Sequence, residues 1–296
     1  MTSAEYCTPR FFFAVPGSIL ARGSGIKISE AAAGAVYSWG VKISIALITL
    51  NEEVNLPRTL ESVMPLVRDG QGEIIVVDSG STDRTLEIAR SHGAKIFIEE
   101  WKGFAAQKNS AMGKASGDWI LQLDADEALE EELVKEINRE LDESGSLVGF
   151  WIPRKNFFLG RWIKHGGFYP DPKLRLIRRD AGKFEEYGAH PTIKVNGPTG
   201  TLKHALIHNA YPTLRGYIDH MNSYSSSGAE VAVAKGHRVF NLLNIIVRPK
   251  LTFLYNYIFR LGFLDGREGL LLHLYHAVYV SWKYAKAWEL ARKNDH

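Results

Sequence analysis

Between Lys42 and about Phe158 the chain alternates apolar runs of strand length with amphipathic runs of helix length. This rhythm constrains the fold more than any other feature, because strand–helix alternation is typical of a parallel sheet covered by crossover helices. The strand-like runs are Ile43–Leu50, Glu73–Asp78, Ala94–Ile98 and Trp119–Leu123. The helix-like runs begin near Asn55, at Thr82 or Asp83, at Phe104 and at Glu130. We therefore expect an α/β fold built on a mostly parallel sheet.

The rhythm changes after Gly149. Residues 150–210 are rich in aromatic residues, Gly, Pro and His, and they contain only short strand-like pieces. From Tyr211 the pattern is helical again, and one apolar stripe recurs at the spacing of a single helix face. This stripe consists of Leu251, Leu254, Tyr255 and Ile258. We therefore expect a catalytic domain over 42–210 and a helical extension over 211–296.

Charge and cysteine content narrow the function classes. The single cysteine, Cys7, excludes an internal disulfide and fits a reducing compartment. The net charge is only +3, but from Lys235 onward there are ten Lys or Arg against four Asp or Glu. Such a basic, aromatic-rich tail indicates contact with an anionic surface. Because no nucleic-acid-binding motif accompanies the charge, we expect no nucleic-acid partner.

The sequence predicts no membrane span. The longest apolar candidate, Leu270–Trp282, is shorter than the roughly 20 residues that a bilayer requires, and it contains two histidines. Near the N-terminus, Phe11–Val15 resembles the apolar part of a signal peptide, but Pro16 and Gly17 interrupt it. We expect residues 1–40 to be a loosely ordered extension, or the product of a start codon assigned too early, and the protein to be cytoplasmic.

Polar and acidic residues follow three of the strand-like runs. The stretches are ITLNEE after the first run, VVDSGSTD after the second and LQLDADE after the fourth. Ligands bind at the carboxyl ends of strands in an open α/β sheet, so we expect these stretches to share one site. Asn51, Glu52 and Asp78 are suited to hydrogen bonds with a nucleoside, although a turn that begins a helix explains them equally well.

Asp124 and Asp126 are separated by one residue after an apolar strand, and Glu127 follows them. Carboxylates this close repel one another unless a cation or a positively charged partner is present. Oxygen ligands favour Mg²⁺ or Mn²⁺ bridging substrate phosphates, and a solvated acidic turn is the alternative. Upstream, Lys108 either meets a phosphate as a point charge or lies on a solvated helix face.

Four stretches together resemble family 2 glycosyltransferases. They are ITLNEE, VVDSGSTDRT, GFAAQKNSAMGKASGDWILQLDADE and NFFLGRWIKHGGFYPDPKLRLIRRD. The resemblance continues through LDGREGLLLHLYHAVYVSWKYAKAWEL and covers residues 42 to about 290. It is closer to the bacterial branch that adds glucose or a related sugar to the lipopolysaccharide inner core. It implies a GT-A fold, a nucleotide-diphosphate sugar donor, a divalent metal and inversion at the anomeric carbon.

The resemblance also implies roles for residues at matching positions. Those implied to bind the donor are Thr49, Asn51, Glu52, Asp78, Lys108 and Asp124. Asp126 would be the main metal ligand, with Asp124 as a further candidate. Apart from the resemblance, His190 is suited to orient a phosphate or to be an additional metal ligand, and a hydrogen-bonded structural role is the alternative. The bound ion would be Mg²⁺ or Mn²⁺, and the donor would be UDP-linked, with ADP-linked donors left open.

The catalytic base is less clearly marked. Related enzymes often carry a His-Glu pair where this chain has His190-Pro191, and proline cannot act as a base. The nearby carboxylates are Asp171, in a loop between two prolines, and Glu185 and Glu186, which are also explained as solvated loop charges.

Other polar and aromatic residues of this region have simpler interpretations. A hydrogen-bonded structural role is expected for His165, His204 and His208. Trp162, Phe168 and Tyr169 suit stacking against a sugar, or packing in a lid.

We therefore expect a metal-dependent inverting glycosyltransferase that moves a sugar from a nucleotide-diphosphate sugar to a membrane glycolipid such as the lipopolysaccharide core. The basic aromatic tail suits peripheral contact with the inner face of the cytoplasmic membrane, or packing on the catalytic domain or a second protomer. Two rivals remain: a polyprenyl-phosphate glycosyltransferase, which needs no base, and a non-catalytic nucleotide-sugar-binding scaffold. The pattern does not indicate an oligomeric state.

Overall fold

The computed structural model describes residues 42–185 and 191–294. Every described residue belongs to one compact unit, which spans 39–296. The expected extension over 1–40 therefore lies outside the described residues.

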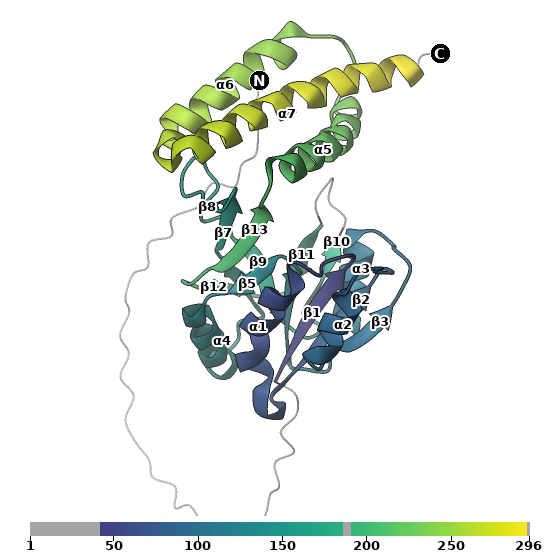
Figure 1. The fold of residues 1–296 in the computed structure, drawn as a ribbon, viewed down its shortest axis with the longest axis vertical. Coiled ribbons are helices and arrows are strands. Elements are labelled where there is room, and N and C mark those ends of the chain that lie inside the picture. Colours follow the sequence, from purple (N-terminus) through teal and green to yellow (C-terminus); the bar gives the residue numbers. More distant parts are fainter. Residues whose placement is uncertain (1–41, 186–190, 295–296) are drawn as a thin grey trace, which may run out of the picture. The chain divides into compact units, whose positions relative to one another are not determined.

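The centre of the described chain is a mixed seven-stranded sheet (Figure 1). Its strands, in spatial order, are β12 (Thr199–Thr201), β6 (Gly149–Ile152), β9 (Lys173–Arg178), β4 (Trp119–Asp124), β1 (Ile43–Thr49), β2 (Gly72–Asp78) and β3 (Lys95–Ile98). β4, β1, β2 and β3 run parallel, while β9 is antiparallel to both β4 and β6. The parallel strands predicted from the sequence are confirmed, and their carboxyl ends meet at one edge.

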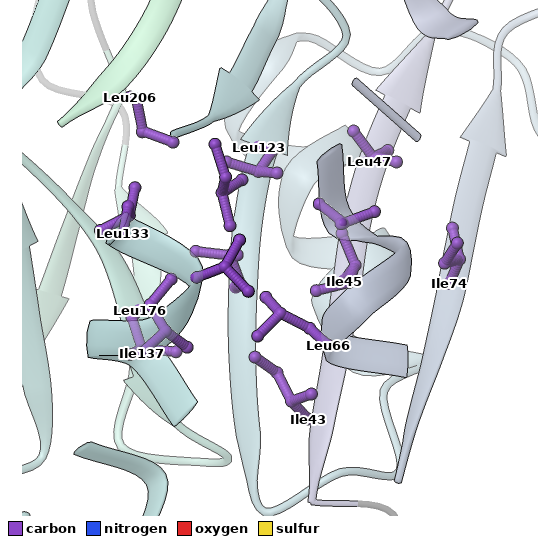
Figure 2. Packing of buried hydrophobic residues seen from close by; sticks show 14 of the residues in the cluster. Ile43, Ile45, Leu47, Leu66, Ile74, Leu123, Leu133, Ile137, Leu176 and Leu206 are labelled. Atoms are coloured by element: carbon purple, nitrogen blue, oxygen red, sulfur yellow. The ribbon is translucent and has the colours of Figure 1, made fainter. Parts of the chain in front are cut away.

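Alternate residues of each central strand enter two different cores because successive side chains of a strand point to opposite faces. On one face, Ile43, Ile45 and Leu47 of β1 pack with Leu66 and Leu133, as Figure 2 shows. Those two leucines belong to α1 (Leu56–Val67) and α4 (Glu131–Glu143). On the other face, Ala46 packs in a second cluster with residues of α3 (Phe104–Gly113). This double burial holds the ends of β1, β2 and β4 at fixed positions.

A smaller four-stranded sheet brings late parts of the chain to the same edge. Its strands, in order, are β5 (Glu127–Leu129), β13 (Leu206–Tyr211), β7 (Arg154–Phe158) and β8 (Arg161–Trp162). In this sheet His208 pairs with Glu127 on one side and with Asn156 on the other. A separate hairpin joins β10 (Gly182–Glu185) to β11 (Thr192–Val195).

The remaining elements are helical. The short ones are η1 (Arg68–Gly70), α2 (Thr85–Ser91), η2 (Leu243–Val247), η3 (Tyr255–Phe259) and η4 (Gly262–Asp265). The C-terminal helices are α5 (Leu214–Ala234), α6 (Arg248–Leu254) and α7 (Gly266–Asn294), which Figure 1 labels. α5 and α7 pack through small side chains such as Ala229 and Ala287. Within 42–185 and 191–294, none of the helices has the length and apolar character needed to cross a bilayer.

Candidate active site

The loops that follow β1 and β2 are joined by hydrogen bonds. The Asn51 side-chain oxygen accepts from the Thr82 backbone N–H at 2.9 Å, and the Asn51 N–H donates to Ser81 Oγ at 2.8 Å. The Glu52 N–H donates to Thr85 Oγ1 at 2.7 Å. The first two predicted stretches therefore form one rigid surface at the edge of the sheet.

Asp78 is fully buried at the end of β2. Its carboxylate accepts hydrogen bonds from Thr49 Oγ1 at 2.7 Å, from Ser81 Oγ at 2.5 Å, and from the backbone N–H groups of Gly80 and Ser81. These four bonds use the ordinary acceptor capacity of a carboxylate. In this structure Asp78 therefore shapes the turn, and a nucleoside that approached it would have to share one of these bonds.

Asp124 lies between two buried cations. Lys108 Nζ is 2.5 Å from one carboxylate oxygen, and Arg175 Nη2 is 2.6 Å from the other. Burial by itself raises the pKa of Asp124, but Arg175 and Lys108 outweigh it and hold that pKa well below its ordinary value. Asp124 is therefore an ionised acid with both oxygens already paired, and Lys108 is part of the site rather than of a solvated helix face.

Arg175 connects Asp124 to a second buried acid. The same Arg175 Nη2 is 2.8 Å from Glu127, which is fully buried and also receives a hydrogen bond from Arg154 at 3.1 Å. Arg154 in turn pairs with Asp171 at 2.7 Å. Alternating charges of this kind satisfy each buried group and fix the positions of all of them.

Asp126 faces a histidine that comes from β13. His208 Nε2 is 3.2 Å from Asp126 Oδ2, while His208 Nδ1 is 2.7 Å from the Asn156 side-chain oxygen. The Asn156 amide nitrogen donates to the Phe168 carbonyl and to Asp171, so its oxygen must accept from a proton on His208 Nδ1. In a neutral His208 the Nε2 lone pair therefore faces a carboxylate oxygen, an arrangement that requires a proton or a cation between them.

This donor set fits a divalent cation. A carboxylate oxygen and an imidazole nitrogen, with the imidazole oriented by a hydrogen bond on its other nitrogen, are typical ligands with a typical supporting partner. The described residues contain no group of three or more His, Cys, Asp or Glu placed to hold a metal. Two protein ligands suffice for Mg²⁺-type sites, in which substrate phosphates and water supply the rest.

Glu52 adds negative potential at this edge. Burial and the nearby carboxylates of Asp126, Asp83 and Asp124 raise the pKa of Glu52, although a hydrogen bond from Asn55 opposes the effect. The Asn55 side-chain nitrogen donates this hydrogen bond to the Glu52 carboxylate at 2.9 Å. The Asn55 side chain makes no capping bond to α1. A cation near Asp126 would relieve the repulsion among these acids.

The described base candidates are both ion-paired. Asp171 accepts from Arg154 and from Lys173 at 2.8 Å, and these cations hold its pKa below the ordinary value although burial alone raises it. Glu185 is half-buried on the β10–β11 hairpin and pairs with Lys194. Glu186 and the metal-ligand candidate His190 lie outside the described residues.

The aromatic residues of the 161–169 loop divide into two groups. Trp162 and Tyr169 contact each other edge to face, with ring centroids 5.3 Å apart, and Lys155 and Lys164 lie over the Trp162 ring. Phe168 packs instead against His273 of α7, with centroids 5.7 Å apart. Phe168 therefore belongs to the packing of the C-terminal helices, and the Trp162–Tyr169 pair is the part of this loop suited to contact a sugar.

Sequence reasoning assigned no site role to Arg154, Arg175, His208 or Asn156. Arg175 and His208 are polar residues inside apolar strands, a signal that was available, because a buried cation or imidazole needs a partner. Asn156 carried no comparable signal. The expected hydrogen-bonded role of His208 agrees with its contacts to Asn156 at 2.7 Å and to Asp126 at 3.2 Å, but its position beside Asp126 was not predicted. His165 and His204 also have carboxylate partners, Asp265 and Glu136, at 2.9 Å each.

Comparison with known proteins shows the family of the chain. The sequence profile described as Glycosyl transferase family 2 matches residues 44–199. The lipopolysaccharide core biosynthesis glycosyltransferase LpsC of Rhizobium meliloti is 30% identical over 255 residues, which are 83% of this chain and 92% of that protein.

Two solved structures also align with the chain. Staphylococcus aureus TarS 1–349 in complex with UDP-GlcNAc is 18% identical, with a TM-score of 0.45 and coverage of 86% of this chain and 92% of that TarS fragment. Glucosyl-3-phosphoglycerate synthase from Mycobacterium tuberculosis, in complex with Mn²⁺, UDP and phosphoglyceric acid, is 19% identical, with a TM-score of 0.44 and coverage of 65% and 78%.

The α/β architecture, with a largely parallel sheet and ligand-type side chains at the strand ends, is that of a GT-A glycosyltransferase. The chain belongs to glycosyl transferase family 2.

Proposed function

We propose that this glycosyltransferase moves one sugar, with inversion, from a UDP-linked donor to a membrane glycolipid of the lipopolysaccharide-core type. The proposed place of action is the inner face of the cytoplasmic membrane, where the protein is peripheral. The similarity to LpsC over 92% of that protein's length supports the acceptor class.

One observation carries the donor half of the proposal. Asp126 and His208 present an oxygen and a nitrogen to the same point, and in a neutral ring the Asn156 contact fixes the tautomer whose Nε2 lone pair faces Asp126. We assign Asp126 and His208 as the ligands of Mg²⁺ or Mn²⁺. Such an ion, when bound, neutralises charge on the departing diphosphate.

The neighbouring side chains have complementary roles in the proposal. Lys108 and Arg175 keep Asp124 ionised and hold it in one orientation, from which it meets hydroxyl groups of the donor. Asn51 and Glu52, on the surface joined to the β2 turn, line the nucleotide side, and Asp78 supports that surface from beneath. This arrangement is preorganised, since its ion pairs exist before a ligand binds.

The acceptor half requires a base on the opposite side of the anomeric carbon. Of the three candidates, Glu186 is preferred here, because Asp171 and Glu185 already pair with Arg154, Lys173 and Lys194. The same pairing favours a second candidate function. A polyprenyl phosphate acceptor attacks with an oxygen that is already ionised, so it needs no base.

A thermal-shift panel of nucleotide sugars with and without Mn²⁺ tests the donor assignment, since a ligand raises apparent stability by mass action. The expected result is a shift with UDP-sugars that depends on Mn²⁺ and is lost in Asp126→Asn. Asp142→Asn, which alters a surface pair with Lys42, is the matched control and should retain the shift. If no nucleotide diphosphate gives a metal-dependent shift, the proposal is wrong.

Product analysis separates the acceptors. Incubation with a UDP-sugar and either core oligosaccharide or polyprenyl phosphate should yield product with the oligosaccharide, and Glu186→Gln should abolish it. Product with polyprenyl phosphate alone, unaffected by Glu186→Gln, would establish the second candidate. If Asp126→Asn abolished metal-dependent UDP binding but left the biological role intact, the scaffold alternative would stand.

A further inference from the structure

The segment from Val239 to Leu274 carries most of the large apolar side chains that are exposed in the described residues. Several are half or more exposed, which is unusual for side chains of this size in a soluble domain. The exposed members are Val239, Phe240, Leu242, Leu243, Ile246, Val247, Leu251, Leu254, Tyr255, Ile258, Phe259, Leu261, Phe263, Leu264, Leu270 and Leu274. We call this set the apolar face.

The apolar face is the outward side of a helical segment whose inward side is already packed. Pro249 is buried, the Ile245 carbonyl accepts from Ser281 Oγ of α7 at 2.9 Å, and Arg248 lies over the Tyr284 ring. The stripe predicted from the sequence points away from α7, since Leu251 and Ile258 are 59% and 48% exposed. This helix thus presents its hydrophobic stripe to the surroundings rather than to the protein.

The charge of this segment is of one sign as far as Leu264. Of the two acids that follow, Asp265 is buried and Glu268 is paired with Arg161 at 3.7 Å. From Lys235 to Leu264 the sequence contains no Asp or Glu, and its cations are Lys235, Arg238, Arg248, Lys250 and Arg260. An apolar stripe bordered by Lys and Arg is the composition of helices that lie in the headgroup layer of anionic membranes. In an isologous dimer the same cationic patch would face itself, and like charges would oppose the contact.

We infer that the apolar face docks on an anionic lipid bilayer, with its apolar side chains in the headgroup layer and its cations on lipid phosphates. This docking deepens the proposed function. Membrane binding by the apolar face does not depend on that function, but the idea that the bound membrane supplies the acceptor rests on it.

Hydrogen bonds connect the apolar face to the active site. Asp265 is buried and accepts from the backbone N–H groups of Lys164 and His165, and the Gly166 N–H donates to the Arg260 carbonyl at 2.9 Å. The 161–169 loop that these bonds hold also contacts Asn156, the partner of His208. Docking through η3 and η4 would therefore bring the acceptor side of the site to the lipid surface.

Vesicle sedimentation with the full chain tests the inference. The wild type should bind vesicles of phosphatidylcholine with phosphatidylglycerol and bind pure phosphatidylcholine much less. Leu251→Asp with Ile258→Asp should lower binding to the anionic vesicles at least about tenfold, because two apolar side chains that would enter the headgroup layer are lost. Ile98→Asp, which changes an isoleucine of similar exposure on β3, is the matched control and should bind like the wild type.

A second variant keeps the test independent of folding. Lys250→Ala, an exposed side chain, should lower anionic-vesicle binding about fivefold at low salt while leaving the melting temperature unchanged. Equal binding to neutral vesicles, or no effect of Leu251→Asp with Ile258→Asp, overturns the assignment. The assignment is also overturned if the wild type is a dimer in solution and the double variant is a monomer, since a second copy of the chain would then cover the apolar face.

Metal-dependent UDP binding measured on the same variants distinguishes the two proposals. The double variant should retain the Mn²⁺-dependent thermal shift while it loses vesicle binding. If the wild type binds vesicles but shows no Mn²⁺-dependent thermal shift with any UDP-sugar, the donor assignment is wrong and the docking surface is still supported.

Discussion

Replacing Arg175 by Met should destabilise the fold more than any other single change at the site. The Arg175 side chain is 7% exposed and has ion pairs of 2.6 Å to Asp124 and 2.8 Å to Glu127. Its removal does not leave either acid alone, because Lys108 stays 2.5 Å from Asp124 and Arg154 stays 3.1 Å from Glu127. Breaking a buried ion pair costs about 3–5 kcal/mol. Because each acid keeps one partner, we expect the free energy of unfolding to fall by about 3 kcal/mol, at the lower end of this range.

The pH dependence gives this prediction a second readout. Arg175 and Lys108 depress the folded-state pKa of Asp124, so the stability that this acid contributes is present above its unfolded pKa and is lost as the pH falls toward the folded value. Without Arg175 the depression is smaller. The difference in the free energy of unfolding between wild type and Arg175→Met should therefore be largest near neutral pH and shrink as the solution is acidified below about pH 4.

Equilibrium urea unfolding at several pH values measures both effects. Arg84→Met, which breaks only a surface pair with Glu87, is the control and should change stability little at any pH. A loss for Arg175→Met below about 1 kcal/mol at neutral pH would refute the reasoning. So would a difference that does not vary with pH, since it would mean that the cost comes from lost packing rather than from unpaired charge.

Three further outcomes are expected. Asn156→Ala should weaken Mn²⁺-dependent UDP binding about tenfold in a calorimetric titration, because His208 loses the partner that fixes its tautomer; unchanged affinity would contradict this role. Glu73→Gln should lower the free energy of unfolding at neutral pH, and its value should approach that of the wild type toward pH 2. The reason is that Lys95 and neighbouring donors outweigh burial and lower the pKa of Glu73 to about 2. A difference in urea unfolding that is the same at every pH would argue against it. Thr213→Ala should cost about 1 kcal/mol in urea unfolding through loss of the N-cap bond to Gly216, whereas no loss would show that α5 does not need the cap.

Local pattern in the sequence was enough for the central sheet. The strand runs were predicted within one or two residues of β1, β2, β3 and β4, because each combines β-branched residues with turn residues at its ends. The same pattern located the strand-end acids, since the carboxyl ends of parallel strands share an edge. The antiparallel position of β9 between β4 and β6 was not predictable in this way, because the pairing joins segments far apart in the chain.

The roles within the site were less accessible to sequence reasoning. Two aspartates in one motif have the same local surroundings, yet Arg175 and Lys108 occupy both oxygens of Asp124 while Asp126 faces His208. For Asp78 the sequence was more informative. The Gly80 and Ser81 N–H groups that donate to its carboxylate belong to the turn that directly follows it in the chain.

The sequence by itself determined the α/β class, the positions of Asp124 and Asp126 at a strand end, and the family, because these depend on periodicity and on contiguous motifs. Only the tertiary structure decided which acid is paired and which faces the imidazole, and that the apolar stripe near Ile258 points outward. Both depend on the register and packing of distant segments: β13 against β5 and β7 for His208, and α7 against α6 for the stripe. Pairing across such separations arises from whole-fold packing, and a local pattern does not encode it.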